Sequence, residues 1–124
     1  MAPPQAVHII DDDAAVRDSM AVMLETRGFD VATYASGRAF LAQGEVAGCV
    51  VTDVQMPDMD GLQLLQAFRA RAPDVPVLLV TARSRRTLTA DAVAQGARAV
   101  IEKPFRPDDL VAMVQAALSG AKPA

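Results

Sequence analysis

Three consecutive aspartates, Asp11, Asp12 and Asp13, follow a short apolar run near the start of this 124-residue chain. Two carboxylates about 4 Å apart repel each other by roughly 4 kcal/mol at an effective dielectric constant of about 20. A surface cluster would relieve this repulsion by solvation alone. A functional cluster requires the rest of the chain to bring counter-charge to the same place.

Four segments that are rich in strand-forming residues end in polar residues, and one of these polar residues is a cation. Ligands of open α/β folds bind outside the carboxyl ends of the strands, at the point where the strand order reverses. We therefore expect three carboxylates, one hydroxyl and one ammonium group to meet in one crevice. They belong to Asp11, Asp12, Asp53, Thr81 and Lys103.

The charges of this group favour a divalent cation. At neutral pH the three carboxylates carry about −3, and Lys103 returns one positive charge, which leaves roughly −2. Mg²⁺ binds oxygen ligands, takes one or two carboxylates and keeps several waters. A divalent cation beside an aspartate and a lysine is also suited to phosphoryl transfer, because the phosphoryl oxygens need positive charge around them.

The elements that must position these residues alternate along the chain. Short apolar runs predict strands, and the segments between them have helical periodicity. Five strands alternating with five helices indicate an α/β fold, a doubly wound parallel sheet covered on both faces. Right-handed crossovers leave few arrangements, and the flavodoxin-like strand order 2-1-3-4-5 is the common one at this size. The expected strands are residues 7–10, 30–34, 48–53, 75–81 and 97–102.

Capping and stop residues predict where helices begin and end. Ser36 is a suitable N-cap for a short second helix, and Gly28 ends the first. A fourth helix is expected within residues 85–95 and is stopped by Gly96. Pro107 suits the first position of the last helix.

Composition indicates a single domain spanning residues 1–124, with residues 120–124 as a tail or the start of a linker. The net charge of −3 argues against nucleic-acid binding by this chain. No apolar run approaches the roughly 20 residues of a membrane span, and the N-terminus lacks the features of a signal peptide. We therefore expect a cytoplasmic protein without a membrane partner. Cys49 and His8 lie in strands, and we interpret both as structural residues.

Four motifs carry a resemblance to a known family: IIDDD, VTDVQMPDMDG, VLLVTA and IEKPF. By their order and spacing, the chain resembles the receiver domains of two-component response regulators over residues 5–119, most closely those of FixJ-type transcriptional regulators. The resemblance implies a CheY-like fold and a switch that accepts a phosphoryl group from a sensor histidine kinase. It implies a protein that catalyses its own phosphorylation and dephosphorylation but is not an enzyme acting on a metabolite.

The resemblance assigns a role to each acidic residue. Asp53 matches the phosphoacceptor. Asp12 matches the acid that ligates Mg²⁺ (or Mn²⁺) directly, and Asp11 matches the acid that holds it through water. Asp53 itself and the backbone carbonyl of Gln55 complete the expected protein ligands. Asp13 is expected to cap the first helix and not to contact the metal.

The remaining motif residues are assigned in the same way. Thr81 matches the hydroxyl that moves toward the phosphoryl group, and Lys103 matches the lysine that pairs with it. The bond between Lys103 and Pro104 is cis in such domains, which X-Pro bonds permit. Val100 departs from the family pattern, which has Tyr or Phe three residues before the lysine. Either Val100 simply packs in the fifth strand, or its stiffness moves the coupling to Thr81 and residues 82–88.

Pro57 and Gly61 have an interpretation that is independent of the family. The chain must turn sharply after Asp53 to leave its carboxylate exposed. Proline supplies a fixed backbone angle and glycine a permissive one. We therefore expect both residues to shape this turn.

Two competing functions are weighed against the switch. A haloacid-dehalogenase-like phosphatase also uses an aspartate, Mg²⁺, threonine and lysine, but it needs a general acid two residues after the nucleophile, where this chain has Gln55. A flavin-binding module needs a hydroxyl- and glycine-rich loop after the first strand, and the aspartates there would repel a phosphate. Both functions are disfavoured.

The output of the switch is open between two alternatives. The chain is either a stand-alone receiver acting through protein–protein contacts or the regulatory half of a transcription factor with a separate DNA-binding domain. Resemblance to the FixJ-type regulators favours the second. The face formed by the fourth helix, the fifth strand and the last helix carries charges of both signs, which is compatible with a phosphorylation-dependent homodimer. These are Arg85, Arg86, Asp91, Arg98, Asp108 and Asp109.

Overall fold

The sheet at the centre of the molecule contains five parallel strands. The computed structural model describes residues 6–44, 46–82 and 86–119 and, of residues 86–88, the backbone alone. The strand order is β2-β1-β3-β4-β5, which confirms the predicted order 2-1-3-4-5. The strands are β1 (Ala6–Ile10), β2 (Asp30–Tyr34), β3 (Cys49–Asp53), β4 (Val77–Thr81) and β5 (Ala99–Glu102).

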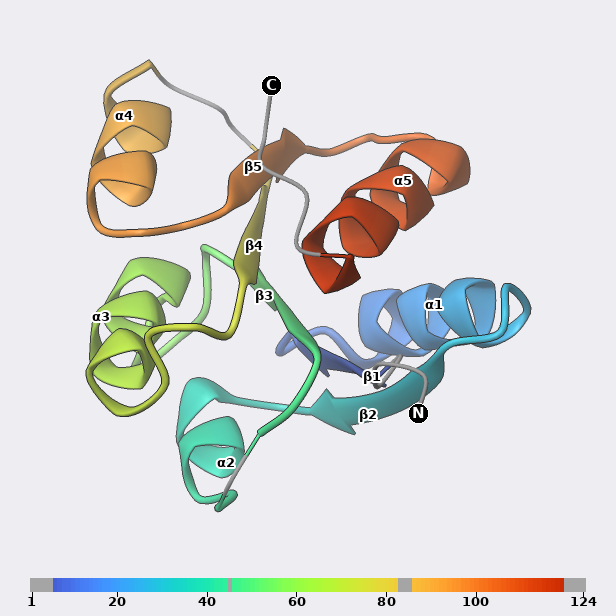
Figure 1. The fold of residues 1–124 in the computed structure, drawn as a ribbon, viewed down its shortest axis with the longest axis horizontal. Coiled ribbons are helices and arrows are strands. Elements are labelled where there is room, and N and C mark those ends of the chain that lie inside the picture. Colours follow the sequence, from blue (N-terminus) through green and yellow to red (C-terminus); the bar gives the residue numbers. More distant parts are fainter. Residues whose placement is uncertain (1–5, 45, 83–85, 120–124) are drawn as a thin grey trace.

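Helices cover both faces of this sheet, as predicted (Figure 1). Two helices lie on one face and three on the other. Of the described helices, none is long and apolar enough to cross a bilayer. The first face carries α1 (Ala14–Glu25) and α5 (Pro107–Leu118), and the second carries α2 (Gly37–Leu41), α3 (Gly61–Arg71) and α4 (Arg86–Ala94).

Side chains of the strands alternate between two hydrophobic clusters. In β3, Cys49 and Val51 pack beneath α1 and α5, whereas Val50 packs beneath the other three helices. All residues of β3 and β4 are buried because helices cover both faces of the sheet. Burial also raises the pKa of the Cys49 thiol to about 12. Cys49 is therefore a core residue, as predicted.

Helix boundaries agree with the predicted signals. The side chain of Asp13 accepts a hydrogen bond of 3.2 Å from the N–H of Val16 and so caps α1. Ser36 caps α2 in the same way, at 3.1 Å. Gly28 and Gly96 follow α1 and α4 with φ angles of 92° and 102°, a conformation that glycine adopts at little cost.

Strands β4 and β5 begin later than predicted. β4 begins at Val77 because Pro76 has no N–H to contribute to the ladder. β5 begins at Ala99 because the N–H of Ala97 is used at the end of α4, where it donates to the carbonyl of Ala92 at 2.9 Å.

Candidate functional site

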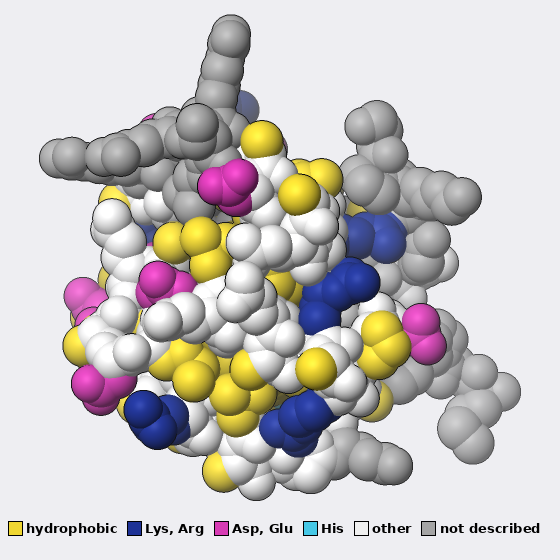
Figure 2. All heavy atoms as spheres, turned by 90° about the vertical axis from the view of Figure 1, so that its left-hand side faces the viewer, with side chains coloured by type: hydrophobic (Ala, Val, Ile, Leu, Met, Phe, Trp, Pro, Cys, Tyr) yellow, Lys and Arg dark blue, Asp and Glu magenta, His cyan; other side chains and the backbone are white. Residues whose placement is uncertain are grey.

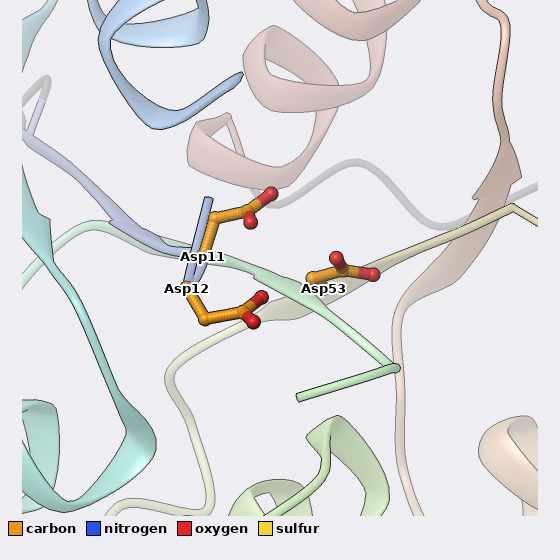
Figure 3. Close-up of side chains that lie close together, drawn as sticks. All are labelled: Asp11, Asp12 and Asp53. Carbon is orange, nitrogen blue, oxygen red and sulfur yellow. The ribbon is translucent and has the colours of Figure 1, made fainter. Parts of the chain in front are cut away.

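The carboxyl ends of β1 and β3 bring three carboxylates together. Figure 3 shows Asp11 and Asp12 after β1 and Asp53 at the end of β3, with the carboxylates of Asp11 and Asp12 on the side that faces Asp53. One oxygen of each lies within 4.8 Å of the other two. The acids that the sequence places at one edge of the sheet therefore meet in the structure.

Lys103 brings positive charge to this cluster. Its Nζ lies 3.5 Å from Oδ2 of Asp53 and 3.7 Å from Oδ2 of Asp11. The lysine follows β5, and its N–H donates to the carbonyl of Thr81 at 2.8 Å. A cis peptide bond joins Lys103 to Pro104, as predicted. One ammonium group faces three carboxylates, so this group of side chains keeps a net charge of about −2.

The three carboxylates differ in exposure. Asp11 is 2% exposed and Asp53 9%, whereas Asp12 is exposed. Burial raises the pKa of Asp11 above its usual value; the N–H of Asp13 and the charge of Lys103 oppose this rise, and the other two carboxylates add to it. Ionised Asp11 is therefore destabilised in the metal-free protein. A bound cation would offset part of that destabilisation.

The loop after Asp53 is folded tightly against the end of β3. The N–H of Gln55 donates to Oδ1 of Asp53 at 3.3 Å. The N–H of Gly61 donates to the carbonyl of Val54 at 2.8 Å. The N–H of Met59 donates to the carbonyl of Pro57 at 2.7 Å. The Gln55 backbone is thus placed beside Asp53, and its carbonyl stays a predicted metal ligand.

The glycine of this loop is needed for a reason that differs from the predicted one. We expected Gly61 to supply a permissive backbone angle, but the positive φ in this loop, 65°, belongs to Asp58. A Cβ atom on Gly61 would instead lie 2.5 Å from the carbonyl oxygen of Asp53. The prediction was wrong about the cause, because α3 begins in direct contact with β3. Asp60 and Gln63 form a capping box at that start, with hydrogen bonds of 2.9 and 2.8 Å.

The other predicted site residues lie near this edge or on the neighbouring strand. Thr81 is 1% exposed at the end of β4, one residue after Val80, which pairs with Asp53. Val100 of β5 is partly buried and packs against the hydrophobic cluster beneath α2, α3 and α4. Three arginine side chains of the predicted switch segment lie outside the described residues. These are Arg83, Arg85 and Arg86.

His8 has structural partners on the strand. One ring nitrogen, Nδ1, lies 3.0 Å from the hydroxyl of Tyr34, and the other, Nε2, lies 3.0 Å from the carbonyl of Ala47. Both nitrogens are therefore engaged in contacts that tie β1 to β2 and to the segment before β3. This agrees with the interpretation of His8 as a strand-face residue.

The family model for the response regulator receiver domain matches residues 7–115. The chain belongs to this family. Transcriptional regulatory protein FixJ of Bradyrhizobium diazoefficiens is 41% identical over 120 residues, which cover 95% of this chain and 58% of that protein. FixJ of Azorhizobium caulinodans is 42% identical over 114 residues, which cover 90% of this chain and 54% of that protein. The receiver domain thus spans little more than half the length of these relatives.

Solved structures agree with this assignment. The structure of FixJ-N has a TM-score of 0.88 at 33% identity and covers 100% of both chains. Full-length FixJ from B. japonicum has a TM-score of 0.86 at 40% identity, covering 95% of this chain and 59% of that one. A CheY-like receiver domain from Methanospirillum hungatei has a TM-score of 0.88 at 29% identity, covering 94% and 95%. The predicted CheY-like fold is confirmed.

Proposed function

We propose that this receiver domain is a phosphorylation-controlled switch whose phosphoacceptor is Asp53. The observation that carries the proposal is the meeting of this carboxylate with a cation and two further acids. Nζ of Lys103 lies 3.5 Å from Oδ2 of Asp53, and oxygens of Asp11, Asp12 and Asp53 lie within 4.8 Å of one another. A nucleophilic carboxylate between a lysine and a cluster of oxygen donors is suited to phosphoryl transfer. A sensor histidine kinase would supply the phosphoryl group.

In the proposed reaction, an oxygen of the Asp53 carboxylate attacks the phosphorus of a phosphohistidine. The phosphorus–nitrogen bond breaks, and the imidazole, protonated on its other nitrogen, leaves as neutral histidine with the electron pair. Lys103 faces the negative charge of the transferred group, and Thr81 supplies a hydroxyl for one of its oxygens. In dephosphorylation, water attacks the phosphorus and the bond to the Asp53 oxygen breaks, so that Asp53 leaves as a carboxylate with the electron pair. The oxygen and both protons of the water end on the inorganic phosphate, H2PO4⁻.

The donor set of the cluster fits Mg²⁺. The proposed direct ligands are Asp12, Asp53 and the carbonyl of Gln55, with Asp11 acting through water; Mn²⁺ takes the same oxygen donors. When bound, the cation supplies positive charge to the phosphoryl oxygens. The burial of Asp11 supports this assignment, because its ionised carboxylate then gains a counter-charge.

The residue two positions after Asp53 favours a switch over a phosphatase that acts on metabolites. This residue is Gln55, which is exposed and cannot donate a proton to a leaving group as a carboxylic acid does. The receiver family is not a class of metabolic enzymes. We therefore propose self-catalysed phosphorylation and hydrolysis as the chemistry of the site.

Acetyl phosphate with Mg²⁺ tests the assignment of Asp53. We expect intact-mass spectrometry to show one phosphoryl group per chain, removed by hydroxylamine as an acyl phosphate should be. Asp53→Asn should abolish the modification. Asp58→Asn is the matched control, because it removes the same charge from the loop that follows Asp53, at a φ of 65° that asparagine tolerates. Full modification of Asp53→Asn would overturn the assignment.

The relatives support a proposal for the output. They are named transcriptional regulatory proteins, and this chain spans 58% of one and 54% of another. We place it as the regulatory domain of such a transcription factor, acting on a DNA-binding domain outside this chain. The alternative is a stand-alone receiver. Sequencing the gene beyond the codon for Ala124 separates the two.

The face formed by α4, β5 and α5 is the proposed homodimer surface. Figure 2 shows the side of the molecule that includes α4, where hydrophobic, acidic and basic side chains are interspersed. Val93 of α4 is 55% exposed and lies near Asp91 in the sequence, and α5 begins with the exposed Asp108 and Asp109. We expect phosphorylation to shift sedimentation from monomer toward dimer at tens of micromolar. A monomer in both states would remove this proposal. The side chains of Arg85 and Arg86 lie outside the described residues.

A further inference from the structure

Arg17 of α1 holds the loop that carries the consecutive aspartates. Nη1 of Arg17 donates a hydrogen bond of 2.7 Å to the carbonyl oxygen of Asp11. Arg17 lies in the first turn of α1 and is partly buried. A charged donor on a carbonyl makes a stronger hydrogen bond than a neutral one.

The carbonyl that Arg17 binds belongs to the peptide group between Asp11 and Asp12. On one side, the N–H of Asp11 donates to the carbonyl of Tyr34 at 3.2 Å. On the other side, the N–H of Asp13 donates to Oδ1 of Asp11 at 2.9 Å. The peptide is planar, so holding its carbonyl also holds the Cα atom of Asp12. The hydrogen bond from the N–H of Asp13 then restrains the backbone on the other side of Asp12, and the two contacts together limit the direction of the Asp12 side chain.

The guanidinium group binds a carbonyl, while Lys103 forms the ion pairs with Asp11 and Asp53. The hydrogen bond of Arg17 therefore leaves the carboxylate oxygens available. The positive charge of Arg17 by itself would weaken cation binding through repulsion. Its hydrogen bond would strengthen cation binding by orienting the ligands. These two effects have opposite signs, so removing Arg17 distinguishes them.

We propose that Arg17 is a positioning residue for the cation site: it holds the Asp11–Asp12 peptide so that both carboxylates converge with Asp53. The inference rests on the proposed function, because it concerns how the proposed Mg²⁺ site is held. Arginine suits this task because its planar guanidinium presents its donors in a fixed direction, whereas a lysine ammonium sits on a flexible stem. Groups that orient metal ligands from outside commonly contribute about tenfold or more in metal affinity.

Calorimetric titration of the full chain with Mg²⁺ tests the proposal. We expect Arg17→Met to raise Kd about tenfold. Arg17→Lys should recover part of the affinity, because it restores a donor with the same charge. The matched control is Arg27→Met, which removes the same charge just beyond the far end of α1, where Arg27 pairs with Asp108 at 2.6 Å. This control should bind Mg²⁺ as the wild type does.

A second measurement separates orientation from general destabilisation. In metal-free ¹⁵N–¹H spectra, the amide signals of Asp12 and Asp13 should shift in Arg17→Met and stay in place in Arg27→Met. If circular dichroism shows that Arg17→Met is unfolded, the Mg²⁺ Kd of Arg17→Lys becomes the test. An Arg17→Lys variant that binds Mg²⁺ with the wild-type Kd would then overturn the proposal. A folded Arg17→Met that binds Mg²⁺ equally or more tightly also overturns it. A wild-type chain that binds no Mg²⁺ would instead overturn the proposed function.

Discussion

The carbonyl oxygen of Asp53 lies 2.5 Å from the position that a Cβ atom on Gly61 would occupy. This part of the backbone has little room to move. The N–H of Val54 donates to the carbonyl of Val80 at 2.9 Å, and the carbonyl of Val54 accepts the N–H of Gly61 at 2.8 Å. A side chain at position 61 must therefore push against the end of β3 that carries the proposed phosphoacceptor.

Gly61→Ala is expected to lower the free energy of unfolding by about 1–3 kcal/mol, as overpacking does. It should also slow phosphorylation by acetyl phosphate, because the displaced backbone is that of Asp53. Gly44→Ala is the matched control, since nothing lies within 4 Å of a Cβ added there. Urea unfolding and the rate of phosphorylation measure the two effects. Equal behaviour of the two variants would contradict the contact.

Asp12 and Asp13 are neighbours with different proposed roles. Asp12→Ala should weaken Mg²⁺ binding strongly while leaving the metal-free fold as stable or more stable, because it relieves repulsion within the cluster. Asp13→Ala should lower stability by about 1 kcal/mol through loss of the cap on α1 and leave Mg²⁺ affinity nearly unchanged. Calorimetric titration and urea unfolding of both variants provide the comparison. Equal loss of Mg²⁺ affinity in the two variants would count against this geometry.

The raised pKa of Asp11 predicts how stability depends on pH. Below the ordinary aspartate pKa of 3.8, the carboxyl group of Asp11 is protonated in both the folded and the unfolded state. As pH rises, the unfolded chain releases this proton first, so the contribution of Asp11 to the free energy of unfolding falls until pH passes the folded-state pKa. Asp11→Asn removes this contribution.

Without metal, Asp11→Asn should therefore gain stability relative to the wild type as pH rises from about 3.8, and the gain should level off above the folded-state pKa. Added Mg²⁺ at neutral pH should stabilise the wild type more than the variant, because the cation binds the folded state. Urea unfolding over a pH series measures both effects. A difference that shrinks with rising pH would contradict the raised pKa.

The order of the elements was predictable because each strand is either buried on both faces or follows a clear stop. β3 and β4 are continuous apolar runs in the sequence for that reason, and Gly96 marks the end of α4. The meeting of the acids was predictable too. Asp11 directly follows β1 and Asp53 ends β3, and the carboxyl ends of these parallel strands share one edge of the sheet.

Contacts between segments distant in sequence could not be predicted in the same way. The need for glycine at position 61 arises because α3 begins against the carbonyl of Asp53, and nothing local in the sequence indicates that approach. The positive φ lies at Asp58, and aspartate is one of the few residue types besides glycine that adopt this conformation readily. Arg17 looks like an ordinary helix residue until its guanidinium is seen on the carbonyl of Asp11.

Val100 gives the last prediction, which concerns how the site communicates with the rest of the domain. It pairs with Leu79 of β4 and packs, partly buried, against the cluster beneath α2, α3 and α4. Valine is stiff at χ1 and too short to move between a buried and an exposed position. A ligand shifts an equilibrium only through its differential affinity for the two states. A side chain that keeps one position contributes little to that difference.

We therefore expect the response to phosphorylation to run through Thr81 and residues 82–88. Backbone NMR shifts with and without beryllofluoride, a mimic of the phosphoryl group, test this expectation. Large changes should be confined to Thr81 and residues 82–88, with Val100 contributing little, and Val100→Ala should preserve the same pattern. Changes centred on β5 (Ala99–Glu102) and spreading from Val100 would show that β5 carries the signal. In that case movement of β5 would take the role of the aromatic ring that the family pattern has at the position of Val100.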